Sequence, residues 1–199
     1  MTTEAQALDG VRERVLTAAC ELFAARGITS TGVDLVSEVA GVSKRSLYQR
    51  FPSKDHLIAA YLTRATDRFM DGLIPPEDSG LPPAGNVLEV FAATQRKSHE
   101  TDFRGCPVLN ATAEIADVTH PVRGIAISYK DQLLGYFRAQ AEAAGAADAE
   151  LLAEQLGMLF DGAMAYGSVR DQPLPDSVHA TARTLLAAQG VELPPTTGA

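Results

Sequence analysis

The residues best suited to chemistry lie in a segment, from Ala40 to Lys54, that carries basic side chains and no acid. Lys44, Arg45, Arg50 and Lys54 are its basic residues. Arginine and lysine bind the oxygens of a phosphate backbone and pair with guanine O6 and N7 in the major groove, while glutamine pairs with adenine. The whole chain has 17 basic and 25 acidic residues, with a net charge of −8. A strictly basic segment in such an acidic chain indicates an approach to nucleic acid.

Two short helices with a tight turn between them are expected to position these side chains. Apolar residues recur at helical spacing over 33–40, and Gly41 follows where the chain must reverse, in a left-handed conformation that glycine adopts at little steric cost. Ser43 is placed to cap a second helix over 44–50, which points Leu47 inward. The pattern predicts a helix-turn-helix, whose second helix can lie in the DNA major groove. The alternative is a helical hairpin of any all-helical protein.

The run from Thr31 to Leu57 resembles the amino-terminal DNA-binding domain of the TetR family of transcriptional repressors. The matching positions are Thr31, Val33, the Ala40-Gly41-Val42-Ser43 turn, Leu47, Tyr48, Phe51, Ser53 and Lys54. Gly32 stands where the family usually has threonine, which removes a possible phosphate-binding hydroxyl, and Ser37 stands where alanine is more usual. The resemblance covers roughly residues 11–70. Beyond that it implies only a helical domain that binds a ligand and forms a dimer.

Eight side chains are predicted to contact DNA, and the contacts expected are of two kinds, to bases and to phosphates. Lys44, Arg45 and Gln49 are the candidates for reading bases. For Tyr48 and Lys54 the resemblance implies contacts to phosphates, which position a protein without reading sequence. Thr31 could either cap a helix or reach a phosphate. The full predicted set is Thr31, Ser43, Lys44, Arg45, Ser46, Tyr48, Gln49 and Lys54.

The remaining sequence predicts an all-α fold of about nine helices, because helical periodicity recurs between glycine and proline breaks and no strand pattern is convincing. The predicted helices cover residues 11–25, 33–40, 44–50, 53–73, 86–100, 107–116, 121–144, 149–170 and 177–189. The predicted division is a helix-turn-helix domain over 10–52, a connector helix over 53–73, a ligand-binding and dimerisation domain over 74–190, and a disordered tail over 191–199. Residues 1–9 are expected to be loose.

The distribution of charge, the cysteines and the hydropathy limit the possible functions further. Residues 1–72 hold nine basic and nine acidic side chains, so the rest of the chain carries the whole net charge of −8. Only the amino-terminal part can therefore approach DNA without strong repulsion. Cys20 and Cys106 lie in segments expected to fold apart, which argues against a disulfide framework or a cysteine metal site. No membrane span, signal peptide or cofactor motif is found, so we expect a cytoplasmic protein without a cofactor.

A ligand pocket is expected between helices of the second domain, because polar and aromatic groups recur in helices expected to face one another. The candidates are His99, Phe103, Cys106, Asn110, Glu114, Tyr129, Met164 and Tyr166. The alternative for each of them is a structural role, and Asn110 and Glu114, which lie four residues apart, could simply support a helix or loop. The mixture of apolar and aromatic residues favours a hydrophobic or amphipathic small molecule.

The last two helices are predicted to form the interface of a homodimer, since one head buries too little surface for tight specific binding. Their apolar residues are Leu152, Leu156, Leu159, Phe160, Ala163, Ala182, Leu185 and Leu186. A four-helix bundle made from two protomers would bury these faces. The alternative is a core within one chain.

The sequence thus predicts a dimeric DNA-binding regulator that occupies a palindromic operator and is released by a small-molecule effector. Two other classes stay open. An all-helical enzyme could use Glu114, His99 and Asp117 as acid and base, although no triad, metal set or phosphate loop ties them together. A helical scaffold that binds protein is the other alternative, and DNA binding that falls with added salt would argue against it.

Overall fold

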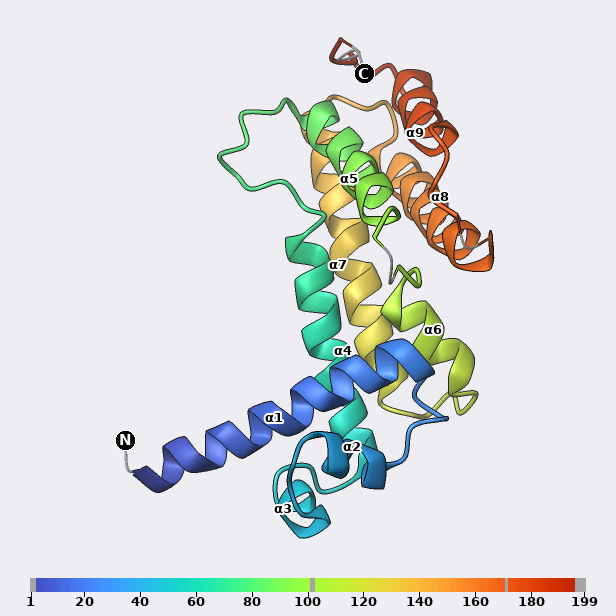
Figure 1. Ribbon diagram of the computed structural model, residues 1–199. Coiled ribbons are helices and arrows are strands. Elements are labelled where there is room, and N and C mark those ends of the chain that lie inside the picture. Colours follow the sequence, from blue (N-terminus) through green and yellow to red (C-terminus); the bar gives the residue numbers. More distant parts are fainter. Residues whose placement is uncertain (1–2, 101–102, 171, 196–199) are drawn as a thin grey trace. The chain divides into compact units, whose positions relative to one another are not determined.

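A computed structural model of the chain describes residues 3–100, 103–170 and 172–195. These residues form helices joined by loops, without a strand among them (Figure 1). The helices are α1 (Thr3–Arg26), α2 (Val33–Val39), α3 (Lys44–Tyr48), α4 (Lys54–Asp71), α5 (Pro83–Lys97), α6 (Pro107–Glu114), α7 (Val122–Ala143), α8 (Ala149–Arg170) and α9 (Ser177–Ala188). The all-α prediction is confirmed. Within the described residues, none of the helices combines the length and hydropathy that crossing a bilayer requires.

The two ends of the chain differ from the prediction. Residues 1–9 were expected to be loose, but α1 already begins at Thr3. The segment over 3–9 is rich in Ala, Glu, Gln and Leu, which all favour helix, and this outweighs the penalty for Gly10 inside the helix. At the other end, Val191 is buried and the Arg183 guanidinium donates to the Pro194 carbonyl over 3.2 Å. Val191 and Pro194 are therefore held in place, while 196–199 lie outside the described residues.

The helix that follows the proline-rich linker also begins earlier than predicted. This helix was predicted to begin at residue 86, yet α5 starts at Pro83, within the proline-rich segment 74–85. Proline fits the first turn of a helix because its missing N–H has no partner there in any case. The buried residues Ala84 and Gly85 are thus part of the helix rather than of the linker. By contrast, the predicted bounds of α8 agree with the structure.

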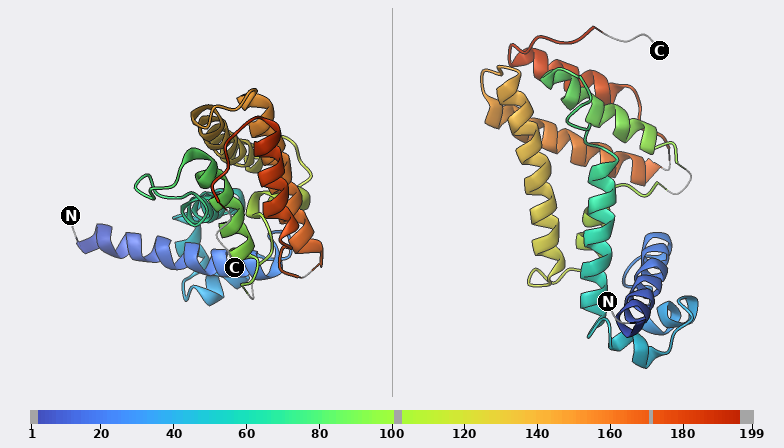
Figure 2. Two further views of the ribbon diagram at one scale, coloured as in Figure 1. Left: turned by 90° about the horizontal axis from the view of Figure 1, so that it is seen from above. Right: turned by 90° about the vertical axis from the view of Figure 1, so that its left-hand side faces the viewer.

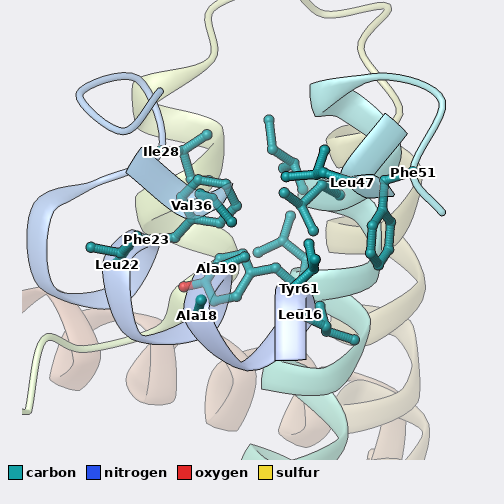
Figure 3. Packing of buried hydrophobic residues seen from close by; sticks show 14 of the residues in the cluster. Leu16, Ala18, Ala19, Leu22, Phe23, Ile28, Val36, Leu47, Phe51 and Tyr61 are labelled. Carbon is teal, nitrogen blue, oxygen red and sulfur yellow. The ribbon is translucent and has the colours of Figure 1, made fainter. Parts of the chain in front are cut away.

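The chain divides into two compact units. The first unit comprises residues 1–67 and 107–126. It contains α1, α2, α3, most of α4, α6 and the first turn of α7, and it is called the head below. Its core is formed by buried side chains that point toward one another (Figure 3). They include Leu16, Ala19, Phe23, Val36, Leu47, Phe51 and Tyr61. Ala111 of α6 and Val122 of α7 belong to the same core, so a segment assigned by sequence to the ligand-binding domain packs in the head.

The second unit comprises residues 68–106 and 127–199, and it is called the body. Within it, α9 lies beside both α5 and α8 (Figures 1 and 2). Phe91 of α5 and Phe137 of α7 stack with ring centroids 5.8 Å apart, and both are fully buried. The body is thus an arrangement of packed helices with aromatic rings in its interior.

Candidate nucleic-acid interface

The turn before α3 has the local geometry that the sequence predicts. Gly41 has a φ of +63°, which places it in the left-handed region. Ser43 has an extended backbone, and its hydroxyl oxygen accepts a hydrogen bond from the Ser46 amide over 3.1 Å. It therefore caps α3 by satisfying one of the amides that a helix start leaves without a partner.

A single leucine anchors α3 to the head. Leu47 has no exposed surface and lies in the head core with Val36 and Phe51 (Figure 3). Because successive helical residues are about 100° apart, burying Leu47 turns its neighbours outward. Five of the predicted DNA-binding residues are exposed: Ser43, Lys44, Arg45, Tyr48 and Gln49. Ser46 is half-buried, and its hydroxyl lies 2.9 Å from that of Ser43.

Lys44 is not a free cation. Its ammonium lies 2.7 Å from a carboxylate oxygen of Asp34, a residue in the first turn of α2. The hydrogen bond to Asp34 and the attraction of its charge raise the pKa of Lys44. The neighbouring Arg45 side chain forms no ion pair within the part of the chain that the structure describes. The two adjacent basic residues of α3 are therefore in different electrostatic states.

The other two predicted contact residues point their polar groups into the head. Thr31 is completely buried, and its hydroxyl donates to the Gly27 carbonyl over 2.8 Å. The Lys54 ammonium donates to the Ile28 carbonyl over 2.7 Å, and its side chain is partly buried. Both hydrogen bonds end on the connection between α1 and α2. These side chains hold that connection, so their part in DNA binding would be to position α2 and α3.

Glu114, predicted as a ligand-binding residue, is also tied to this connection. Its carboxylate accepts hydrogen bonds from the Thr29 amide over 2.9 Å and from the Thr29 hydroxyl over 3.1 Å. Gly27 has a φ of +87°, and a Cβ added there would lie 2.9 Å from a Glu114 oxygen. The backbone conformation at this position favours glycine, and a Cβ there would also displace the Glu114 carboxylate. The Glu114 carboxylate therefore supports a loop within the head, which is the structural alternative that the sequence left open for it.

A second contact within the head, made by His120, was not predicted from the sequence. The His120 Nε2 lies 3.3 Å from a carboxylate oxygen of Asp55, at the start of α4, and its Nδ1 accepts from the Val122 amide over 3.2 Å. The sequence signal was an isolated histidine before a proline, which does not reveal a partner so far away in the chain. Asn110 lies in the head as well, on α6.

The geometry of the head agrees with comparisons to known proteins. Residues 15–61 match the model of a family described as bacterial regulatory proteins, tetR family. The fold is similar to that of a TetR transcriptional regulator from Streptomyces avermitilis, with 39% identity and a TM-score of 0.85 over 92% of this chain and 99% of that one.

The chain belongs to the TetR family of transcriptional regulators.

Two further relatives agree with this assignment. A TetR-family transcriptional regulator from Streptomyces coelicolor is 31% identical, with a TM-score of 0.81 over 91% of this chain and 96% of that one. The HTH-type transcriptional activator FasR of Mycolicibacterium smegmatis is 43% identical over 65 residues, which is 33% of this chain. This last match spans only 30% of the length of FasR. This TetR-family chain is therefore a DNA-binding transcriptional regulator with a helix-turn-helix.

In the body of this TetR-family chain, three predicted ligand-binding residues are buried: Cys106, Tyr129 and Met164. Phe103 is half-buried, and its ring lies 2.8 Å from where a Cβ on Gly167 would be. His99 and Tyr166 are exposed instead. The Tyr129 hydroxyl is buried without a hydrogen-bond partner in the described part of the chain. Burial is the main cause that raises the pKa of Tyr129, so this hydroxyl stays protonated and can donate.

A groove between α7 and α8 was not anticipated. It has a volume of about 340 Å³ and contains none of the predicted ligand-binding residues. Its lining is Lys130, Asp131, Leu133, Leu134, Glu154, Gly157, Met158 and Asp161. Lys130 pairs with Asp161, and its ammonium lies 5.3 Å from the centre of the Tyr129 ring. The lining of the groove therefore combines apolar side chains with three carboxylates and one ammonium group.

The predicted dimer residues require a correction. Leu152, Leu156, Phe160, Ala163, Ala182 and Leu186 are all buried within a single chain. These six side chains are occupied by packing inside the body and are not available to a partner, whereas Leu159 and Leu185 are partly exposed. The apolar residues that α8 leaves exposed form a different row: Leu151, Met158, Tyr166 and Val169. Their spacing of seven, eight and three residues keeps them on one side of the helix.

Proposed function

We propose that this chain is a dimeric repressor that occupies a palindromic operator and leaves it when a small hydrophobic or amphipathic effector binds the body. Two heads would read half-sites about one helical turn of DNA apart, ~34 Å, or a multiple of it. An effector that favours another head spacing would shift the dimer off DNA by its difference in affinity for the two states. Such a regulator would act in the cytoplasm. The predicted domains, over 10–52 and 74–190 with their connector, remain part of this proposal.

The observation that carries the DNA-binding part is the outward face of α3. Arg45, Tyr48 and Gln49 project from a helix whose only buried side chain, Leu47, fixes its rotation in the head. Arginine can pair with guanine through two hydrogen bonds, and glutamine can do the same with adenine. Tyr48 has a hydroxyl suited to a phosphate oxygen.

The test of this part is DNA binding by purified protein over a range of salt concentrations. Operator duplexes come from the DNA upstream of the protein's own gene or from selection out of a random library. The affinity should fall steeply with salt, since cations are released from the phosphates on binding. Arg45→Ala should change the preferred sequence, whereas Lys54→Ala should weaken all duplexes alike. Arg96→Ala, which removes an exposed arginine of α5, is the matched control. Equal binding of wild type and Arg45→Ala to every duplex would refute the assignment.

The dimer is proposed to form through the exposed row of α8. Met158 and Val169 have 66% and 84% of their surface exposed, which is high for apolar side chains. The outward side of α9 carries small uncharged residues, among them Ala180, Thr184 and Ala188. The apolar row of α8 and the small uncharged residues of α9 suit contact with a second copy of the same chain, packed about a twofold axis. Sedimentation that shows a monomer at micromolar concentration would contradict this part.

The effector site is proposed to lie in the body, with Tyr129 as a hydrogen-bond donor to the ligand. Buried polar groups in proteins almost always have a partner, so an unpartnered hydroxyl in an apolar interior fits a site for a ligand with one acceptor group. A thermal-shift screen of small molecules, coupled to release from operator DNA, would identify the effector. Tyr129→Phe should keep the fold and DNA binding while weakening the effector, and unchanged effector affinity would remove Tyr129 from the site. The reading as a repressor follows the family resemblance, although the relative FasR is an activator.

The enzyme alternative finds no support in the positions of its candidate groups. The Glu114 carboxylate is occupied by Thr29, and an oxygen of Asp117 accepts from the Thr119 amide and hydroxyl, each over 2.8 Å. His99 lies in the body rather than in the head. For the scaffold alternative, loss of DNA binding at high salt remains the discriminating measurement.

A further inference from the structure

The groove between α7 and α8 is separate from the site proposed for the effector, since Tyr129 does not line it. Its volume of about 340 Å³ is at the lower end of the range for small-molecule sites, ~300–1,000 Å³. The residues of α8 that line it follow one another at helical spacing, which places them in one stripe along two turns of the helix. They are Glu154, Gly157, Met158 and Asp161.

The middle of this stripe is apolar. Gly157 meets Leu134 of α7 there, and a Cβ on Gly157 would lie 3.2 Å from a terminal methyl carbon of Leu134. Because Gly157 has no side chain, it leaves space between the two helices. Met158, which has 66% of its surface exposed, lines the same part of the groove. An aliphatic chain placed here would remove apolar surface from water, which is favourable.

One end of the groove carries the charge of Asp131. Lys130 of α7 pairs with Asp161 of α8, and its ammonium lies 5.3 and 5.4 Å from the ring centres of Tyr129 and Phe160. The charge of Lys130 is therefore already compensated. Asp131, the next residue of α7, is exposed and forms no ion pair within the described residues. This end has two carboxylates and one ammonium group, so one negative charge is in excess.

The other end carries the charge of Glu154. This residue is seven positions before Asp161 on α8, which is about 10 Å along the helix axis. It is exposed and has no ion-pair partner in the part of the chain that the structure describes. Arg138 of α7 pairs with Glu150, and that hydrogen bond is the main cause that raises the pKa of Arg138, with a smaller contribution from the charge of Glu154. Glu154 thus remains available to a ligand.

We propose that this groove binds a linear diammonium ion, an aliphatic chain with an ammonium group at each end. One ammonium would pair with Asp131 and the other with Glu154, while the chain would lie against Leu134 and Met158. A single ion pair at a surface contributes little. A chain of matching length makes the second contact intramolecular, so both pairs can form together. The site goes beyond the proposed function, and it requires neither DNA binding nor the effector site.

The experiment titrates the whole protein, isotope-labelled in its methionine methyl groups, with α,ω-diaminoalkanes from diaminobutane to diaminodecane and follows the methyl signals by NMR. Met158 lines the groove, whereas Met70 and Met164 do not and serve as internal references. The Met158 signal should shift in a saturable manner. The affinity should be highest near diaminohexane and diaminooctane, whose nitrogen atoms are about as far apart as the two ends of the groove. It should fall with added salt, which screens exposed charges.

Uncharged and singly charged probes and three variants test the role of the two carboxylates. Octylamine should bind about twofold to fivefold more weakly than diaminooctane, the range that one surface ion pair corresponds to, and octanediol more weakly still. Glu154→Gln and Asp131→Asn should each weaken diaminooctane by a similar factor and leave octanediol unchanged. Glu77→Gln removes an exposed carboxylate of the body that does not line the groove, and it should leave both affinities unchanged. Circular dichroism should show that every variant is folded.

Four outcomes would overturn the proposal. The Met158 signal could respond to no diamine, octanediol could bind as tightly as diaminooctane, or Glu77→Gln could weaken binding as much as Glu154→Gln. Met158 also belongs to the exposed row of α8, so the fourth outcome concerns the dimer. A response that appears only when Val169→Lys has separated the dimer would show that a second copy covers the groove. None of the four bears on DNA binding, which the salt-dependent titrations with duplexes test separately.

Discussion

The helices α3 and α8 are built on the same principle, yet their exposed sides differ in chemistry. Each buries one side and presents a row of side chains on the other. On α3 the exposed residues are Lys44, Arg45 and Tyr48, around the single anchor Leu47. On α8 the exposed row is apolar and lies opposite a side that is buried through several turns.

This difference indicates what each helix is exposed for. A row with ammonium, guanidinium and phenol groups can exchange its hydration for the phosphates and base edges of DNA. An apolar row gains nothing from DNA and is stabilised only when another apolar surface removes it from water. The anchors differ too: one leucine fixes α3, whereas α8 is held by Leu152, Leu156, Phe160 and Met164. Of the two helices, α3 is therefore the more easily displaced.

The largest effect is expected from removing the anchor of α3. Leu47→Ala should lower the free energy of unfolding by about 2–5 kcal/mol, because a fully buried leucine leaves a cavity. Chemical unfolding followed by circular dichroism measures this loss. Leu156→Ala is the matched control, since it removes an equally buried leucine from the body. At temperatures where both variants are folded, only Leu47→Ala should lose affinity for DNA. Equal DNA affinities of the two variants would show that DNA binding does not depend on the anchor of α3 more than on that of α8.

The next effect concerns the exposed row of α8. Replacing Met158 and Val169 by lysine should dissociate the dimer, since each apolar side chain buried between two copies contributes about 1.5–3 kcal/mol. Sedimentation equilibrium should then show a monomer, and operator affinity should fall because two half-sites are no longer read together. Gln132→Lys, at an exposed position on α7, is the control and should remain dimeric. A double lysine variant that sediments as a dimer would place the interface elsewhere.

A smaller effect is expected at the tie between α6 and the connection before α2. The variants Glu114→Ala and Thr29→Ala, alone and together, form a double-mutant cycle for the hydrogen bonds that join them. We expect a coupling free energy of about 0.5–1.5 kcal/mol in the free energy of unfolding, the usual contribution of such bonds. Additive effects of the two substitutions would show that the tie contributes nothing. Reduced DNA affinity of either variant would show that the position of α3 depends on this contact as well as on Leu47.

The smallest effect is a dependence of stability on pH in the head. The Arg64 guanidinium donates to both carboxylate oxygens of Glu13, over 2.7 and 2.6 Å, and the hydrogen bonds from Arg64 are the main cause that lowers the pKa of Glu13 below its usual 4.5. A folded-state pKa below the unfolded value gives stability that is present above pH 4.5 and is lost as the pH falls through the lowered pKa. Wild type and Arg64→Gln should therefore differ in thermal stability at neutral pH and converge in acid. A difference that stays constant down to pH 3 would contradict this reading.

Much of the helix-turn-helix could be predicted because its signals are local. The left-handed Gly41, the Ser43 cap and the buried Leu47 are each determined by residues within a few positions of one another. The ion pair of Lys44 with Asp34 and the ties of Glu114 and His120 could not be predicted. They join residues from 10 to 85 positions apart, and nothing in the sequence alone brings such residues together.

For α8 the sequence determined a helix and its bounds, but it did not determine which side faces inward. Apolar residues lie almost all round this helix, so two rows, one through Leu152 and Leu156 and one through Leu151 and Met158, fit the same periodicity equally well. Packing against α9 within the body decided between them: the first row is buried and the second is exposed. The charges of α3, by contrast, exclude all but one orientation, because burying an unpaired cation costs far more than exposing it. A helix with one apolar side carries its orientation in its sequence, while a helix that is apolar on every side receives it from its neighbours.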